Sequence, residues 1–186
     1  MSFVGKEFIT SATKRLKYYK DLGDKTFEQL SDADFHYQPN EESNSIAIII
    51  QHVAGNMLSR WTNFLTEDGE KEWRQRDDEF EIHTYDKQQL HVLWEKGWAC
   101  FLNAIEPLEK KDLKKKIYIR QESLTVIDAI NRQLAHYPYH IGQIIYIAKI
   151  IKNKNWQNLS IPKGDSTQYN NGQQLKDPAR KFRALG

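Results

Sequence analysis

An apolar stripe between positions 127 and 151 continues for about seven helical turns. Its members follow one another in steps of three and four residues, which is the spacing of one face of an α-helix. They are Ile127, Ile130, Leu134, Tyr137, Ile141, Ile144, Ala148 and Ile151. Thr125 precedes the stripe as a candidate N-cap, with Asp128 three residues later. Because such a face must be covered by other elements, this segment predicts a helical core.

Three earlier segments show the same periodicity. They cover about residues 3–19, 45–65 and 86–107, and the first is expected to end near Gly23. Residues that cap or break helices separate the segments, which predicts an all-α, antiparallel four-helix bundle. The expected N-terminal caps of the second and third segments are Ser45, and Asp86 with Gln89.

The stretches between the expected helices differ from one another. Residues 117–120 alternate between apolar and polar, which favours a short strand or hairpin before the last helix. Residues 67–85 are rich in charge and have no clear period, but they contain Trp73 and Phe80. Bulky apolar side chains of this kind are usually covered, so we expect this stretch to pack against the helices.

The chain length fits one domain. With 186 residues, it lies within the usual range of a single unit. We expect the helical bundle over residues 1–151 and a polar C-terminal extension of the same domain over residues 152–186. In this extension Asn, Gln, Lys and Gly replace the apolar periodicity.

The composition argues against several classes of function. The 27 Lys and Arg residues and 25 Asp and Glu residues give a net charge of +2, far from the excess typical of nucleic-acid-binding proteins. The longest apolar run, residues 46–50, is much shorter than the roughly 18 residues of a membrane span. A single cysteine, Cys100, and an N-terminus unlike a signal peptide favour a cytoplasmic protein. We therefore expect no nucleic-acid and no membrane partner.

Two of the six histidines have the spacing of a metal-binding pair. His136 and His140 are four residues apart, so their rings project from one helix face about one turn apart. On a helical wheel they lie roughly 100 and 60 degrees to one side of Tyr137. His52 lies about 120 degrees from the centre of the second segment's stripe. If these two flanks meet, three imidazoles converge on a divalent ion and leave a coordination position open.

The same residues also have simpler interpretations. A histidine pair at this spacing arises by chance in many helices, and each ring can hydrogen-bond at the edge of a core. Pro138 lies between the two histidines and is expected to kink the helix. Arginines 60, 74 and 76 can reach an anionic substrate, but weak exposed ion pairs with neighbouring acids are the commoner outcome.

The stretch from His136 to Gln143 has the pattern H-x-x-x-H-x-G-Q. Together with His52 on an earlier helix, it resembles the metal-binding pattern of the DinB/YfiT-like superfamily over about residues 3–151. The resemblance implies a four-helix bundle with up-down-down-up helix order, and it implies a homodimer. The metal ligands that it implies are His52, His136 and His140.

Residues 60–74 and 77–80 resemble one branch of that superfamily, whose members are bacterial proteins without an assigned reaction. Characterised relatives in other branches are thiol S-transferases, a mycothiol-dependent isomerase and a metal-dependent hydrolase. Many members carry a histidine and an arginine where this chain has Tyr139 and Ile141. The resemblance implies a zinc or nickel ion and a low-molecular-weight thiol, and it assigns no catalytic residue.

From these observations we expect a divalent-metal-binding protein with a small-molecule substrate or thiol partner. In one interpretation it is a metal-dependent thiol S-transferase or hydrolase, in which the ion activates a thiol or a water molecule and residues 67–85 shape the pocket. The alternative is a non-catalytic protein with a structural or sensory metal site. An open coordination position favours the enzyme, and a closed one favours the structural role.

Overall fold

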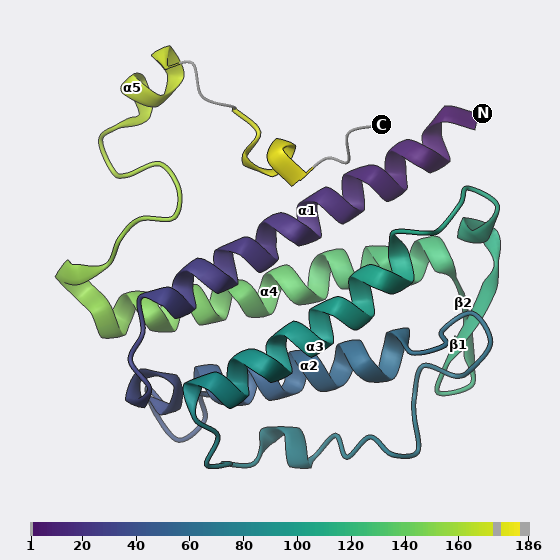
Figure 1. The fold of residues 1–186 in the computed structure, drawn as a ribbon, viewed down its shortest axis with the longest axis horizontal. Helices are drawn as coiled ribbons and strands as arrows, with labels where there is room; N and C mark the ends of the chain where they lie inside the picture. The colour runs from purple at the N-terminus through teal and green to yellow at the C-terminus, as the bar shows by residue number, and fades with distance from the viewer. Residues whose placement is uncertain (1, 173–175, 183–186) are drawn as a thin grey trace.

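The structure, a computed structural model, describes residues 2–172 and 176–182, most of which are helical (Figure 1). The long helices in this part are α1 (Ser2–Glu28), α2 (Ile46–Trp61), α3 (Lys87–Ile105) and α4 (Val126–Lys152). The smaller elements are η1 (Ala33–His36), η2 (Asp78–Phe80), η3 (Asp112–Lys114), β1 (Lys116–Ile119), β2 (Glu122–Thr125), η4 (Asn153–Asn155), α5 (Ser166–Asn171) and η5 (Pro178–Phe182). No helix among the described residues is both long and apolar enough to cross a membrane.

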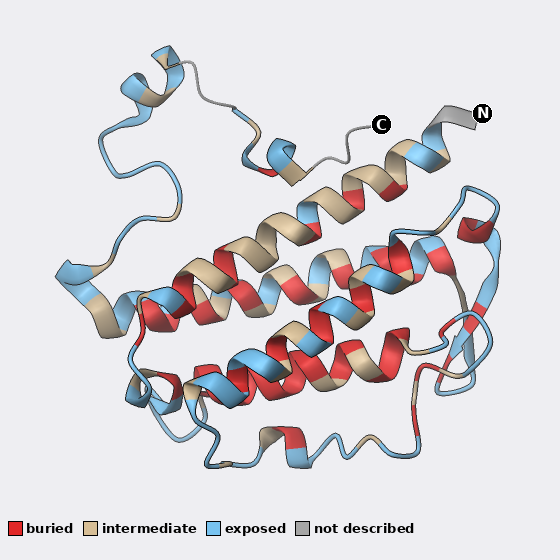
Figure 2. Cartoon of the chain, in the orientation of Figure 1, coloured by how far each residue is buried: buried red, intermediate tan, exposed pale blue. Residues whose placement is uncertain are grey.

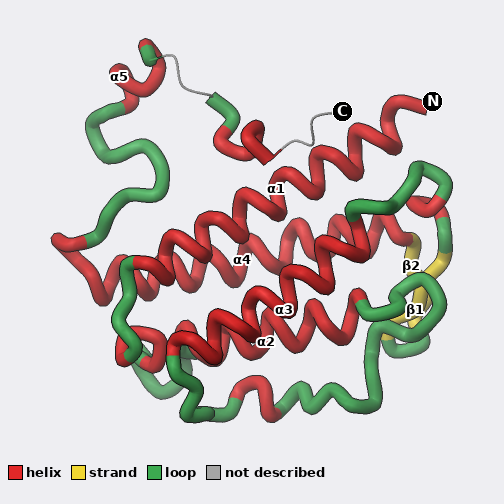
Figure 3. Tube along the Cα trace, in the orientation of Figure 1, coloured by secondary structure: helices red, strands yellow, loops and turns green. Residues whose placement is uncertain are grey.

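The long helices pack in two parallel pairs. Helices α1 and α4 run in one direction and α2 and α3 in the other (Figure 1). Helix α1 packs most extensively on α4, and α2 packs most extensively on α3. Each long helix therefore packs most closely against a helix that runs parallel to it, whereas the sequence predicts antiparallel neighbours. The reason is the connection over residues 62–86, which returns along α2 before α3 begins (Figure 3).

The core lies between the inward faces of these helices (Figure 2). It contains fully buried aromatic rings in edge-to-face contact, among them Trp94, Trp98 and Tyr137. The predicted stripe of α4 is buried from Ile130 through Ala148, except for Leu134, which is partly exposed. Ile127, in contrast, is 37% exposed, because Val126 takes the buried place at the start of the helix.

The predicted starts of three helices are confirmed. Ser45 accepts a hydrogen bond from the backbone N–H of Ile48 at the start of α2. Asp86 and Gln89 form a capping box at the start of α3. Thr125 accepts a hydrogen bond from the backbone N–H three residues later and so caps α4. Each cap satisfies a backbone donor that the first helical turn leaves without a partner.

Two predicted helix ends are wrong. Helix α1 continues through Gly23 to Glu28, because the ring of Trp94 packs directly on the glycine and stabilises the helix there. A Cβ atom on Gly23 would lie 2.7 Å from that ring. Helix α2 ends at Trp61 rather than at residue 65, because Asn63 has a left-handed backbone with φ of 50°.

The expected hairpin before the last helix is confirmed. Strands β1 and β2 are antiparallel, with Ile117 opposite Leu124. Two residues join them, Arg120 and Gln121, with φ angles of 54° and 65°. Positive φ at both central residues is the geometry of the tight turn that matches the twist of a hairpin.

The polar extension after α4 returns to the helices. Asp177 forms ion pairs with Lys14 and Arg15 of α1, and Ala179 in η5 is fully buried. The η5 segment of this extension therefore packs along α1, whereas α5 stands away from the long helices in Figure 1. The remaining residues of the extension, 173–175 and 183–186, lie outside the described residues.

Candidate metal centre

Three histidines from two helices converge beside the core. His52 comes from α2, and His136 and His140 come from α4. The Nε2 atom of His136 lies 3.1 Å from Nε2 of His140 and 3.4 Å from Nε2 of His52. One nitrogen from each ring lies within 4.8 Å of the others. The structure thus brings together the three histidines that the sequence singles out.

Helix α4 carries its pair across a proline. The helix is continuous from Val126 to Lys152, and Pro138 lies inside it. His136 and His140 are therefore one turn apart on an unbroken helix, and their ring centroids are 4.8 Å apart. The i, i+4 spacing accounts for their proximity, as the sequence predicts.

The Nδ1 atom of each ring, which points away from the other two histidines, faces a side-chain oxygen. His52 Nδ1 lies 3.1 Å from Glu79 Oε2, His136 Nδ1 lies 3.3 Å from Gln133 Oε1, and His140 Nδ1 lies 2.8 Å from Gln143 Oε1. A carboxylate oxygen and an amide oxygen only accept hydrogen bonds, so each Nδ1 is the donor.

This pattern of donors determines where the ring protons are. Gln143 donates through Nε2 to the hydroxyl of Tyr139, which leaves its Oε1 free to accept from His140. With the proton on Nδ1, the Nε2 atom of a neutral imidazole has only a lone pair. In this tautomer the three Nε2 atoms, each within 3.4 Å of another, can all bind one ion.

Burial keeps two of these rings neutral. The pKa of His136 is lowered to about 3, first because the ring is buried and next because His140 and His52 are close. The pKa of His140 is lowered to about 4, mainly by burial, although its hydrogen bond to Gln143 acts in the opposite direction. Both rings are uncharged near neutral pH, which is the form that binds a metal ion.

Glu79 is a site residue that the sequence analysis did not predict. It lies in η2, which packs on α2, and it also accepts two hydrogen bonds from Arg74, at 2.7 and 2.8 Å. Arg74 holds the pKa of this carboxyl below its usual range against the opposing effect of burial, and His52 adds to the lowering. Gly55 leaves room for the carboxylate, because a Cβ there would collide with Glu79 Oε1.

Of Trp73 and Phe80, only Phe80 packs at the site. The ring of Phe80 lies 4.8 Å from the ring of His52, centroid to centroid. Trp73 is 57% exposed. The stretch nevertheless packs against the helices, as predicted, because η2 contacts α2. The signal for Glu79 was its place beside Phe80, because an apolar residue in a charged stretch brings its neighbours toward the core.

A pocket of about 250 Å³ opens beside the histidines. Its lining residues are His52, Asn56, Arg60, Arg74, Arg76, Arg120, Arg132, Gln133 and His136. The expectation of exposed ion pairs is correct for Arg76, which pairs with exposed Asp77 at 3.9 Å. It is wrong for Arg60 and Arg74, whose side chains are only 6% and 2% exposed.

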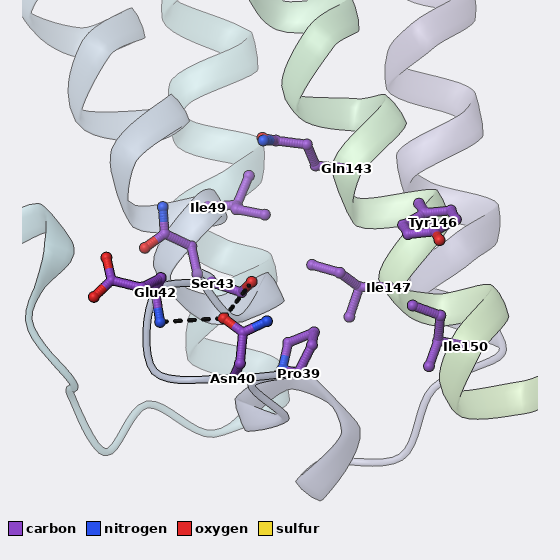
Figure 4. A pocket seen from close by; sticks show the side chains of 10 residues that line it. Pro39, Asn40, Glu42, Ser43, Ile49, Gln143, Tyr146, Ile147 and Ile150 are labelled. Atoms are coloured by element: carbon purple, nitrogen blue, oxygen red, sulfur yellow. Dashed lines mark hydrogen bonds between the residues drawn. The ribbon is translucent and has the colours of Figure 1, made fainter.

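A second cavity, of about 380 Å³, lies farther along α4 (Figure 4). Ile49, Ile147 and Ile150 line it, with Asn40 on the opposite side accepting hydrogen bonds from Glu42 and Ser43. Figure 4 shows Gln143 at its upper edge. No histidine lines this cavity, so the smaller pocket is the one that opens on the cluster.

Fold and site together define a mostly helical protein with a cluster of three histidines, one buried and two partly buried, beside an arginine-lined pocket. The chain belongs to the DUF1572 family, whose members are described as proteins of unknown function, and the match covers residues 3–165. Comparison with curated proteins found no match, and comparison with solved structures found none.

Proposed function

We propose that the protein binds a divalent metal ion through His52, His136 and His140. The observation that carries this proposal is the convergence of three Nε2 atoms, while the Nδ1 atom of each ring faces a hydrogen-bond acceptor. Tetrahedral zinc with ligand bonds of about 2.0–2.1 Å places its ligand nitrogens roughly 3.3 Å apart. The distances of 3.1 and 3.4 Å between the Nε2 atoms fit that spacing.

We further propose that the four long helices form a bundle of the DinB/YfiT-like type. Their directions in Figure 1 support this, because α1 and α4 run one way and α2 and α3 the other. The position of the histidines, one on α2 and two on α4, agrees with the pattern of that superfamily.

We propose a catalytic role, as a metal-dependent thiol S-transferase or hydrolase with zinc or nickel. A divalent ion at such a site supplies a Lewis acid that lowers the pKa of a bound thiol or water. Glu79 orients His52 through its Nδ1–H, and the two glutamines orient the other rings. The adjoining pocket supports an accessible coordination position, because it opens directly on His52 and His136.

One observation favours a non-catalytic alternative. The cluster joins α2 to α4, which have fewer contacts with each other than with their parallel neighbours. An ion shared by these helices would hold the two pairs together, as structural metal sites do.

Metal content tests the site itself. We expect about one zinc or nickel ion per chain in the native protein, and almost none in a His136→Ala/His140→Ala variant, because two of three ligands are lost. Exposed His91 lies on α3, and a His91→Ala variant is the matched control that retains the ion. Equal metal content in the native protein and the double variant, or no metal in the native protein after reconstitution, would contradict the proposal.

Cobalt substitution separates the catalytic from the structural role. An accessible ion changes its visible absorption when a thiol or azide is added, whereas a closed site does not. A changed spectrum supports the catalytic role, and an unchanged one supports the structural role.

That the protein forms a homodimer and lies in the cytoplasm are two further predictions from the sequence.

A further inference from the structure

The pocket beside the histidines has an unusual charge. Five arginines line it, and no carboxylate does. The whole chain has a net charge of only +2, so this is a local concentration of positive charge. Like charges in one small pocket repel each other and favour a bound anion.

Two of the five guanidinium groups are held in place by buried ion pairs. Arg74 makes two hydrogen bonds to Glu79. Arg60 donates to the backbone oxygen of Gly69 and, at 2.9 Å, to Glu70. These two groups form a fixed part of the pocket wall.

The other three guanidinium groups are exposed and only weakly compensated. Arg120 is 58% exposed and shares Glu70 with Arg60. Arg76 is half exposed, lies over the ring of Phe80 and forms a distant ion pair with Asp77. The guanidinium of Arg132, on α4, makes no hydrogen bond or ion pair with any residue in the described ranges 2–172 and 176–182. Glu70 and Glu79 thus balance two of the five positive charges, because Arg60 and Arg120 share one carboxylate, and three charges stay in excess.

The hairpin places Arg120 over the pocket. Its turn is fixed by Asp68, whose carboxylate accepts the backbone N–H groups of Arg120 and Gln121, both at 2.8 Å. The backbone N–H of Gly69 donates to Tyr118 in β1, also at 2.8 Å. The hairpin is therefore attached to the connection over residues 62–86, which supplies Arg74 and Arg76.

We propose that this pocket binds a phosphate monoester group of a small-molecule substrate, next to the histidine cluster. Its place as a substrate subsite rests on the proposed function, but the binding of the anion itself rests on the arginines alone. A phosphate monoester carries nearly two negative charges at neutral pH and has three terminal oxygens, so several guanidinium groups contact it at once. A single carboxylate has one charge and two oxygens, and it leaves most of the three spare charges unmatched.

Calorimetric titration of the metal-free protein tests this inference. Phenyl phosphate and benzoate are matched probes, because both attach the anion to one aromatic ring. We expect phenyl phosphate to bind at least tenfold more tightly than benzoate, and its binding to weaken as salt screens the charges. Removing one charge-assisted contact costs about tenfold in affinity, so an Arg120→Gln/Arg132→Gln variant is expected to lose about 100-fold.

An Arg180→Gln variant is the control, because Arg180 is exposed in η5, outside the pocket. Equal affinity for the two probes, or unchanged phenyl phosphate binding in the double arginine variant, would overturn the inference. Metal uptake, measured after reconstitution of a second portion of each sample, keeps the two proposals apart. If the protein binds phenyl phosphate but takes up no metal, the anion pocket is supported and the metal site is contradicted. If it takes up metal but does not bind phenyl phosphate, the metal site is supported and the anion pocket is contradicted.

Discussion

At the scale of single residues, the site depends on one position without a side chain. Gly55 lies one helical turn after His52, and the Glu79 carboxylate occupies the space that a Cβ would fill. This close approach is what lets Glu79 accept from the His52 ring while it also pairs with Arg74. Partners of this kind set both the orientation and the tautomer of a ligand histidine.

We predict that Gly55→Ala weakens metal binding by about 10- to 100-fold, because the methyl group displaces Glu79 from His52. The affinity is measured by competition with a chromophoric chelator. Gly142→Ala in α4 is the control, because nothing lies within 4 Å of a Cβ there. A Gly55→Ala protein with native metal affinity would show that Glu79 does not support the site.

The candidate residues could be predicted from the sequence only where they lie on helices. The spacing of His136 and His140 and the flank position of His52 follow from helical geometry, which is a local property. Glu79 and Arg74 lie in a segment without periodicity, and their positions depend on how that segment folds over α2. Phe80 indicates that this segment approaches the core, but no local pattern encodes which side chain Glu79 meets there.

At the scale of elements, the capped helix starts were predictable, whereas the ends of α1 and α2 were not. A start is determined by a side chain that bonds to the next turn, as Ser45 and Asp86 do. The end of α1 was missed because a glycine usually favours termination, whereas here the ring of Trp94 covers Gly23 and its indole N–H donates to Asp24. That contact joins positions 70 residues apart.

We predict that Gly23→Ala destabilises the protein by about 1–3 kcal/mol, because the added methyl group overpacks against Trp94. Alanine is otherwise the better helix former, so the same change at Gly142 is expected to stabilise the protein by about 0.5–1 kcal/mol. Urea unfolding followed by circular dichroism measures both. Changes of the same sign in the two variants would contradict the packing argument.

At the scale of the whole molecule, the histidine cluster joins the two parallel helix pairs. Helix α2 belongs to the pair with α3, and α4 belongs to the pair with α1. A ligand that binds only where these pairs meet stabilises the native state over the unfolded chain.

We predict that zinc at 100 times its dissociation constant raises the free energy of unfolding by about 2.7 kcal/mol. Thermal unfolding with and without the ion measures this as a rise in the midpoint temperature. The His136→Ala/His140→Ala variant is expected to show no rise. A rise of similar size in that variant would place the binding elsewhere on the protein.

The distance along the chain between the clustered histidines has a consequence for the order of assembly. His52 and His136 are 84 positions apart, and loop closure over such a length comes late relative to local helix formation. During synthesis, a chain that has not yet reached residue 136 presents only one of the three rings. The imidazoles meet only after α4 has docked, so capture of an ion by all three would mark the completion of folding rather than begin it.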